Sequence, residues 1–445
     1  MPIFVMSNIL VFRLSFLKNR SHIMKKLLCL LLASLMVLAG YSEGYDGGLF
    51  MDKHNADIDS IKENNKIYYT TIDKSLLQIS AKFGPNLVSN TYENGQGVLT
   101  FDGAITSIEN HAFEGCMNLE SITIPDGVTS IGNCAFVHCE FLTSITLPDG
   151  LTSIGGMAFF SCKNLASITL PNSVTSIGNL VFANCENLLS ITIPDGVTSI
   201  GMSSFDYCVN LVSITLPNSV TSIGNRAFYC CKNLASITLP DSVTSIGERA
   251  FFFCEKLASI TLPDNLTSIG NGAFEKCRKL KEFKGKWASK DGRCLVMERV
   301  RRRFVPSYEV TEYILGNFAP YGITEYIIPD GVTSIGNYAF SDCDNLVCLT
   351  IPDSVTFIGE RAFFFCKNLA SITLPNNLTS IGDSAFSYCR KLTELYCKSV
   401  VPPGIGDGML KDVPETLQIY VPIQSVDAYK SAWKNYSNQI VGYNF

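Results

Sequence analysis

Hydrophobic and polar residues repeat along this chain with a period of 23 residues. A cysteine marks the period at positions 116, 139, 162, 185, 208, 231, 254 and 277. A phenylalanine stands three residues before each of these cysteines, and both residues return in step at positions 340/343, 363/366 and 386/389. A period in the twenties that is sustained over many copies predicts a solenoid, in which each copy forms one coil.

Within each copy, alternating apolar and polar residues predict a β-strand. In the copy that starts at Cys162, Ile168 and Leu170 alternate with Ser167 and Thr169. The first pair is therefore expected to face the core, and the second pair to face solvent. The spacing Leu-x-x-Ile-x-Leu in this stretch is the strand signature of a leucine-rich repeat.

The second half of each copy carries apolar residues that turn back toward the same core. Val174, Ile177 and Phe182 have this role in one copy, and Gly178 is expected to allow a tight turn between them. A single coil cannot bury its apolar side alone, whereas stacked coils share a continuous core. We therefore expect a β-rich repeat solenoid of the leucine-rich repeat class, with one parallel strand per coil and with N- and C-terminal caps.

The repeat also resembles that of a known family. The motif C-x-x-L-x-S-I-T-L-P-x-x-V-T-S-I-G-x-x-A-F runs here from Cys231 to Phe251, and copies of it cover most of residues 97–397. This motif is similar to the repeats of BspA-like bacterial surface leucine-rich repeat proteins. The resemblance implies a non-enzymatic surface protein that adheres to host matrix proteins or to other cells.

Breaks in the repeat divide the chain into segments. The expected segments are an upstream mis-start or extended n-region (1–23), a signal peptide (24–42), an N-terminal cap (43–96), a repeat array (97–285), a divergent hairpin or degenerate repeats (286–322), a second repeat array (323–397) and a C-terminal cap (398–445). The phase of the repeat places the first coil at Val98–Ile108. In the last segment, Ile419–Pro422 reads as a strand and Ser425 as the N-cap of a helix.

The segment after Met24 has the character of an export signal. Two lysines precede Leu27–Gly40, a run without charges that is too short to span a membrane. Tyr41 stands where the lipobox of a lipoprotein would carry a cysteine, which argues against a lipid anchor. We expect an exported chain, at the cell surface, secreted or in the periplasm, without a transmembrane segment once the signal is removed.

The chain has 17 cysteines and a net charge of −5. Stacked strands lie about 4.8 Å apart with their side chains parallel, whereas a disulfide needs Cβ atoms about 3.8 Å apart and turned toward each other. We therefore interpret the repeated cysteines as buried thiols that act as small hydrophobic residues. Because no global basic field surrounds the chain, nucleic acid is not an expected partner.

Two columns of hydroxyl side chains are expected on the outer face of the strands. The columns include Ser167, Ser190, Ser213, Thr169, Thr192 and Thr215. One interpretation is that small β-compatible residues keep an exposed sheet soluble and regular. The other is a broad surface for a protein or glycan ligand on a host or neighbouring cell.

The variable positions between each phenylalanine and cysteine carry aromatic residues, among them Tyr207, Tyr229 and Phe253. They are expected on the edge opposite the strands. Packing between coils is one explanation. An exposed aromatic strip that binds a glycan is the alternative, and it would make the protein a glycan-binding accessory protein.

The divergent segment contains a basic cluster, Arg301, Arg302 and Arg303. In the family that the chain resembles, such a segment is a hairpin with Asp-Gly at its turn, and Glu298-Arg299 stands in that place here. The cluster could dock an acidic glycan or a phosphate group, or it could simply face water.

No motif for catalysis, cofactor binding or metal binding stands out in this sequence. It lacks a P-loop, a GxGxxG motif and an HExxH motif. His111 shares its repeat position with Cys134, but His138 and Cys139 are expected to face different ways, so a zinc site is not expected. We therefore expect a binding protein that is not an enzyme and that needs no cofactor.

Overall fold

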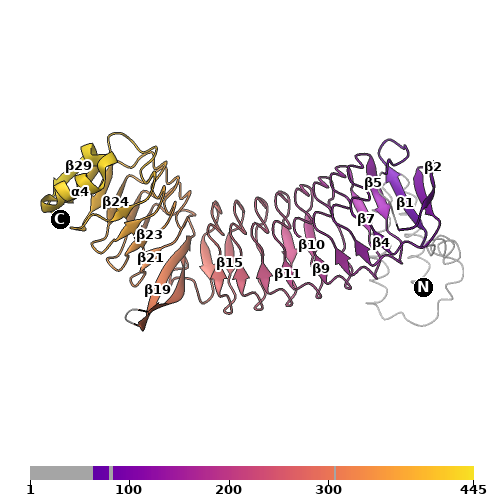
Figure 1. Ribbon diagram of the computed structural model, residues 1–445, viewed down its shortest axis with the longest axis horizontal. Coiled ribbons are helices and arrows are strands. Elements are labelled where there is room, and N and C mark those ends of the chain that lie inside the picture. The colour runs from indigo at the N-terminus through magenta and orange to yellow at the C-terminus, as the bar shows by residue number, and fades with distance from the viewer. Residues whose placement is uncertain (1–63, 80–83, 305–306) are drawn as a thin grey trace, which may run out of the picture. The chain divides into compact units, whose positions relative to one another are not determined.

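The computed structural model describes residues 64–79, 84–304 and 307–445, with the side chains of residues 299–310 excepted. The expected upstream segment 1–23, the signal peptide 24–42 and Tyr41 lie outside the described residues. The described chain is the β-rich solenoid that the 23-residue period predicts (Figure 1). Within the described residues, no helix is long and apolar enough to cross a membrane.

Each coil contributes a first strand to a parallel sheet, at the position that the alternating pattern predicts. These strands are β5 (Leu119–Thr123), β7 (Ser144–Thr146), β10 (Ser190–Thr192), β12 (Ser213–Thr215), β15 (Ser259–Thr261), β17 (Glu282–Lys284), β20 (Glu325–Ile327), β22 (Cys348–Thr350), β24 (Ser371–Leu374) and β26 (Glu394–Cys397). In two coils the strand is reduced to isolated bridges, at Ser167 and Thr238.

Each coil also contributes a short second strand, which the sequence pattern did not reveal. These strands are β4 (Ser107–Ile108), β6 (Ser130–Ile131), β8 (Ser153–Ile154), β9 (Ser176–Ile177), β11 (Ser199–Ile200), β13 (Ser222–Ile223), β14 (Ser245–Ile246), β16 (Ser268–Ile269), β21 (Ser334–Ile335), β23 (Phe357–Ile358), β25 (Ser380–Ile381) and β27 (Gly404–Ile405). They pair in parallel, and Ser222 lies opposite Ser245 one period on.

A stack of phenylalanine rings runs through the core between the two sheets. The rings from Phe113 to Phe274 are spaced 23 residues apart and are buried. Phe205 and Phe228 are typical neighbours, with ring centroids 5.5 Å apart and ring planes 4° from parallel. Because every coil presents the same ring at the same place, the stack fixes the register between coils.

The repeated cysteines are buried and free, as the column geometry predicts. The structure adds a role that the sequence did not reveal, because nine of the eleven thiols donate a hydrogen bond to a phenylalanine carbonyl of the preceding coil. Cys139 Sγ lies 3.0 Å from the carbonyl oxygen of Phe113, and Cys254 Sγ lies 3.2 Å from that of Phe228. Burial raises the pKa of Cys277 to about 12, so this thiol stays protonated.

The glycine that follows every second strand except β4 lies where neighbouring coils approach closely. Gly178 was expected to allow a tight turn, but its φ is not in the left-handed region. Instead, a Cβ atom on Gly178 would lie only 2.3 Å from the backbone nitrogen of Gly156 in the preceding coil. Glycine is therefore required by contact between coils and not by a turn.

Gly247→Ala is expected to lower the free energy of unfolding by about 2 kcal/mol, since the added methyl group forces the coils apart. Its Cβ would lie 2.4 Å from the backbone nitrogen of Asn225. Chemical denaturation measures the effect. Gly150→Ala is the matched control, because its Cβ would meet no atom closer than 3.7 Å. Equal effects from the two substitutions would contradict the close-approach explanation.

An antiparallel sheet caps the N-terminal end of the solenoid. It contains β1 (Lys66–Thr71), β2 (Leu87–Glu93) and β3 (Gln96–Phe101), and β1 lies between β3 and β5. The expectation that the first coil begins at Val98 is therefore wrong, because residues 96–101 belong to the antiparallel cap. The first coil starts with Ile105 and β4, since β4 pairs in parallel with β6.

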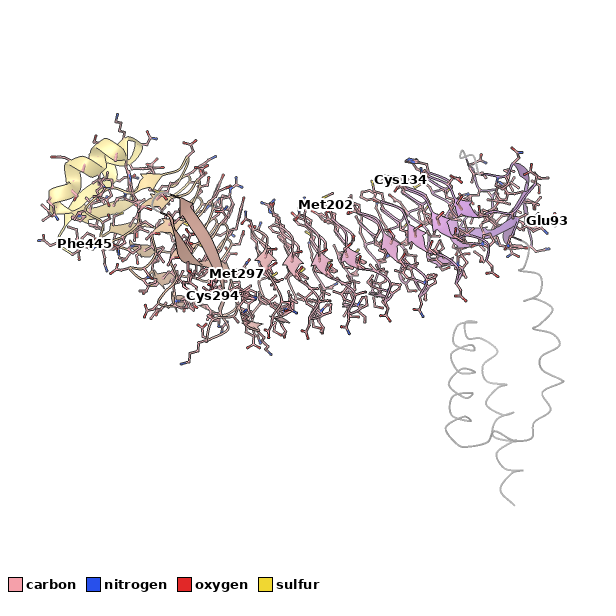
Figure 2. The ribbon with its side chains drawn as sticks, turned by 60° about the horizontal axis from the view of Figure 1, so that its bottom comes forward. Glu93, Cys134, Met202, Cys294, Met297 and Phe445 are labelled. Carbon is pink, nitrogen blue, oxygen red and sulfur yellow. The ribbon has the colours of Figure 1, made fainter. Side chains whose placement is uncertain are left out.

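A long hairpin interrupts the array. Its strands are β18 (Cys294–Phe304) and β19 (Ser307–Phe318), and β19 also pairs in parallel with β21. The prediction of a turn at Glu298-Arg299 is wrong, since these two residues pair with Tyr313 and Glu312 inside the strands. Cys294 and Met297 lie in this first strand (Figure 2).

The C-terminal end is closed by β28 (Gln418–Pro422), η2 (Ile423–Ser425), α4 (Val426–Ala432), η3 (Lys434–Gln439) and β29 (Ile440–Tyr443). The predicted strand and helix are both present. Ser425 precedes the helix as predicted, but its hydroxyl does not cap it and donates instead to the carbonyl of Val400, 2.8 Å away. The buried side chains of Tyr429 and Trp433 attach the helix to the preceding loop by hydrogen bonds to Ser399 and Pro403.

The hydrophobic core is divided into two clusters at the hairpin. At this junction the loop that follows Phe274 meets the loop that follows Phe340. The Ser341 hydroxyl donates to Glu275 Oε1 at 2.9 Å, and Lys276 Nζ lies 3.7 Å from Asp342. Glu275 is buried with its Oε2 unpartnered, and burial raises the pKa of its carboxyl group to about 7.

Candidate functional site

The outer face of the first strands presents hydroxyl groups in two regular columns. Ser190, Ile191 and Thr192 lie directly opposite Ser213, Ile214 and Thr215 of the next coil. The serines and threonines are exposed, while the isoleucines between them are buried. We call this surface the hydroxyl face, and it comprises Ser167, Thr169, Ser190, Thr192, Ser213 and Thr215 with their equivalents in other coils.

The hydroxyl groups of these six residues make no hydrogen bond to another described residue of the protein. A different threonine column shows the contrast, because its hydroxyls are used in folding. Thr152 Oγ1, for example, donates to the carbonyl of Thr129 at 2.9 Å, and Thr244 Oγ1 to that of Thr221 at 3.2 Å. The hydroxyl face is therefore left to solvent or to a ligand.

Aromatic side chains of adjacent coils contact one another in the loops that follow the second strands, and we call this surface the aromatic edge. Cys134 and Met202, which lie in the same loops, mark one edge of the solenoid in Figure 2. Packing between coils accounts for part of this aromatic edge. Tyr229 and Phe252 are stacked with centroids 4.6 Å apart, and Phe252 is buried. Tyr207 differs, because 44% of it is exposed beside the ring of Tyr229. The edge is thus partly a packing feature and partly an accessible surface.

Cations cover several of these rings. The Arg226 guanidinium lies 4.0 Å from the ring centre of Tyr229 and also pairs with Asp206 at 3.1 Å. Lys232, Lys276 and Arg278 lie 5.5 to 5.8 Å from the ring centre of Phe253. This edge would therefore present positive charge together with aromatic surface.

Arg301, Arg302 and Arg303 lie in β18, where the backbone register places them opposite Val310, Glu309 and Tyr308. Their side chains lie outside the described part of the structure. The structure therefore places this cluster in a strand of the hairpin, which contributes no residue to the hydroxyl face or to the aromatic edge.

The histidines do not form a metal site in the described residues. His111 Nδ1 lies 2.6 Å from Glu114, and His138 contacts the ring of Phe160 edge-on. No group of three potential ligands among histidine, cysteine, aspartate and glutamate comes together in the ranges that the structure covers.

Two surface features were missed by sequence reasoning. In the last coils, Tyr396 and Tyr420 replace the outward threonines of the hydroxyl face and stack with ring centroids 4.7 Å apart. The second feature is a basic segment before the hairpin, at residues 276–293. It holds eight lysines and arginines against two acids, so a count of charge along a moving window would have found it.

Comparisons with known proteins agree with this architecture. The model of the BspA type leucine rich repeat region matches residues 92–212, 178–287 and 316–439 in six copies. A leucine rich cell surface protein from Faecalibacterium prausnitzii A2-165 is 24% identical with a TM-score of 0.53, and the match covers 86% of this chain and 97% of that chain.

A leucine-rich repeat protein from Bacteroides ovatus ATCC 8483 is also 24% identical with a TM-score of 0.53, and the match covers 83% of this chain and 99% of that chain. At this level of identity the two solved structures show the same fold and no more. A search among curated proteins found no match.

Proposed function

The chain belongs to the family of BspA-type leucine-rich repeat proteins, and from this premise we propose that it is an exported, non-enzymatic binding protein. Its partner would be a protein on a host or neighbouring cell, and its role would be adhesion. One observation carries the proposal, namely the exposed and unused hydroxyl groups of the hydroxyl face. A repeated surface of this kind can add many weak, similar contacts into one strong attachment.

The local chemistry of this face suits a protein ligand. Hydroxyl groups both donate and accept hydrogen bonds, and their small side chains lose little conformational freedom on binding. The face is uncharged between Thr169 and Thr215, so a partner can approach without first displacing charged groups. An extended strand or loop of a matrix protein could therefore lie across several coils at once.

A triple variant with glutamate at Thr169, Thr192 and Thr215 tests this proposal. We expect at least about a tenfold loss of binding to immobilised matrix proteins such as fibronectin or fibrinogen. The reason is that the bound partner would bury three carboxylates, and none of them would have a partner in the interface. The melting temperature should fall only modestly, since all three residues are exposed, although carboxylates on neighbouring coils repel one another. Unchanged binding by the triple variant would exclude the hydroxyl face.

The control variant carries glutamate at Asn172 and Asn218, which are exposed in the turns after the strands. It adds charge to the same coils without changing the hydroxyl face, and it is expected to bind as the unaltered protein does. Equal losses in the two variants would show a general effect of charge and would contradict the proposed surface.

A glycan-binding accessory protein is the second candidate function, and the exposure of Tyr207 favours it. An aromatic ring that is open on one face can stack against a sugar ring. Replacing Tyr207, Tyr229 and Phe253 with alanine would then abolish saturable binding to a glycan while leaving matrix-protein binding intact. A glycan panel probed with this variant and the unaltered protein distinguishes the two candidates.

A further inference from the structure

Positive charge is concentrated on one coil of a chain that is acidic overall. Residues 276–293 hold eight of the 35 lysines and arginines, although the net charge of the whole chain is −5. Five of the exposed members are joined by Lys256 of the preceding coil. We call this surface the basic patch, and it comprises Lys256, Arg278, Lys279, Lys281, Lys284 and Lys286.

Most of these cations have no acidic partner among the residues that the structure describes. Lys284 pairs with Glu282 at 3.0 Å, and Arg278 lies 3.8 Å from Asp344. Among the described residues, the other four lysines form no ion pair. Because the patch is not neutralised from within, it keeps a net positive field outside the coil.

Two of the lysines interrupt a stabilising ladder. Asparagines occupy the same position in four successive coils, and their side chains bond to one another: Asn187 donates to Asn164 at 3.0 Å, and Asn233 donates to Asn210 at 3.0 Å. The next two positions of this column are Lys256 and Lys279.

Folding gains nothing from this exchange. An ammonium group cannot accept a hydrogen bond, so two lysines cannot continue the ladder. Neighbouring coils also bring them to about 5 Å from each other, where like charges repel. The substitution of asparagine by lysine at both positions therefore calls for a role outside the fold.

Aromatic rings stand beside the unpaired lysines. Lys281 Nζ lies 5.1 Å from the ring centre of Tyr321, which is 43% exposed. Lys286 Nζ lies 4.7 Å from the ring centre of Trp287. Cations beside an exposed aromatic ring such as Tyr321 suit a ligand that carries both anionic groups and sugar rings.

We propose that the basic patch binds a linear sulfated polysaccharide. The spacing of the coils, about 4.8 Å, is close to the length of one sugar unit, so successive lysines can meet successive charged groups. Nucleic acid and anionic membranes are less suitable, because the acidic remainder of the chain would repel a large charged surface. The proposal rests on the proposed function as an exported binding protein. It names a ligand class for a surface that adjoins the end of the hydroxyl face, since Lys284 follows Thr261 in the threonine column.

The double variant Lys256→Asn/Lys279→Asn tests the proposal. The substitutions restore the asparagine ladder of the earlier coils, so the melting temperature is expected to stay the same or to rise. Affinity for heparin, measured by titration calorimetry with the full-length protein, is expected to fall at least about tenfold, since two charge-assisted contacts are lost. Binding by the unaltered protein should weaken as salt is added.

Lys391→Asn is the matched control, because Lys391 occupies the same column in the second array, away from the patch. It should leave heparin binding unchanged. Desulfated heparin should bind weakly, whereas equal binding of heparin, double-stranded DNA and phosphatidylserine vesicles would overturn the assignment to a sulfated polysaccharide. Full heparin binding by the double variant would also overturn it.

The proposal for the hydroxyl face and the proposal for the basic patch can be refuted independently of each other. If the double variant loses heparin but keeps its matrix protein, both proposals stand as separate surfaces. If no matrix protein binds while heparin binding still depends on Lys256 and Lys279, the adhesion proposal fails and the patch remains. If the unaltered protein does not bind heparin at all, the proposal for the basic patch is refuted and the adhesion proposal is unaffected.

Discussion

Replacing Phe228 with alanine is expected to lower the free energy of unfolding by about 4 kcal/mol, through lost burial and the cavity that remains. The ring is fully buried and lies between two others, with its centroid 5.5 Å from that of Phe205 and 5.2 Å from that of Phe251. Its neighbours are anchored in their own coils, so they cannot easily close the gap. Urea denaturation followed by circular dichroism measures the loss.

Phe141→Ala is the control for this result. Phe141 is 43% exposed and lies outside the stack, so its removal should cost less than about 1 kcal/mol. Each coil contacts only its neighbours, and the damage to the stack is therefore local. A split of the unfolding curve into two transitions would agree with local damage. Overlapping curves for Phe228→Ala and the unaltered protein would contradict the expected loss of stability.

Glu275→Gln is expected to stabilise the protein by about 3 kcal/mol at pH 8 and by almost nothing at pH 4. Burial raises the pKa of this carboxyl group from 4.5 to about 7, so the folded protein holds the proton more tightly than the unfolded chain does. The contribution of Glu275 to stability is then highest below pH 4.5 and falls as pH rises to about 7. Glutamine stays neutral throughout and can still accept the hydrogen bond from Ser341.

The measurement is the difference in free energy of unfolding between variant and unaltered protein across this pH range. The two proteins share every other titrating group near the site, including Asp342, Lys276 and Arg249, so the difference isolates Glu275. A difference that stays constant with pH would show that the carboxyl group titrates normally. The expected curve would mean that the junction between the two arrays is firmest in mildly acidic surroundings.

The fold could be predicted from the sequence because every coil repeats the same few physical demands. The alternation of apolar and polar residues predicted the first strand of most coils, although the coil of Ile168 itself forms only an isolated bridge at Ser167. The repeated cysteine predicted the coil length. The short second strands were missed because a serine and an isoleucine alone carry no periodicity. The role of Gly178 was misjudged because close contact between coils is a property of the stack and leaves no mark within one copy.

The candidate surfaces could be predicted only in part. The hydroxyl columns followed from the strand alternation, and their exposure agrees with it. The sequence could not show that Tyr229 stacks on Phe252, because packing at the edge depends on how the loops of adjacent coils meet. The lysines around Lys279 were not predicted as a binding surface, because their significance depends on the asparagine ladder that they interrupt.

The phenylalanine and cysteine columns make the interfaces between regular coils nearly the same. A duplication or deletion of one whole 23-residue unit would therefore join two surfaces that already fit. Such a change would alter the length of the array by one coil, while the caps and the hairpin keep their own contacts. Proteins built in this way can differ in solenoid length between lineages through unequal recombination, without a new interface between coils having to evolve.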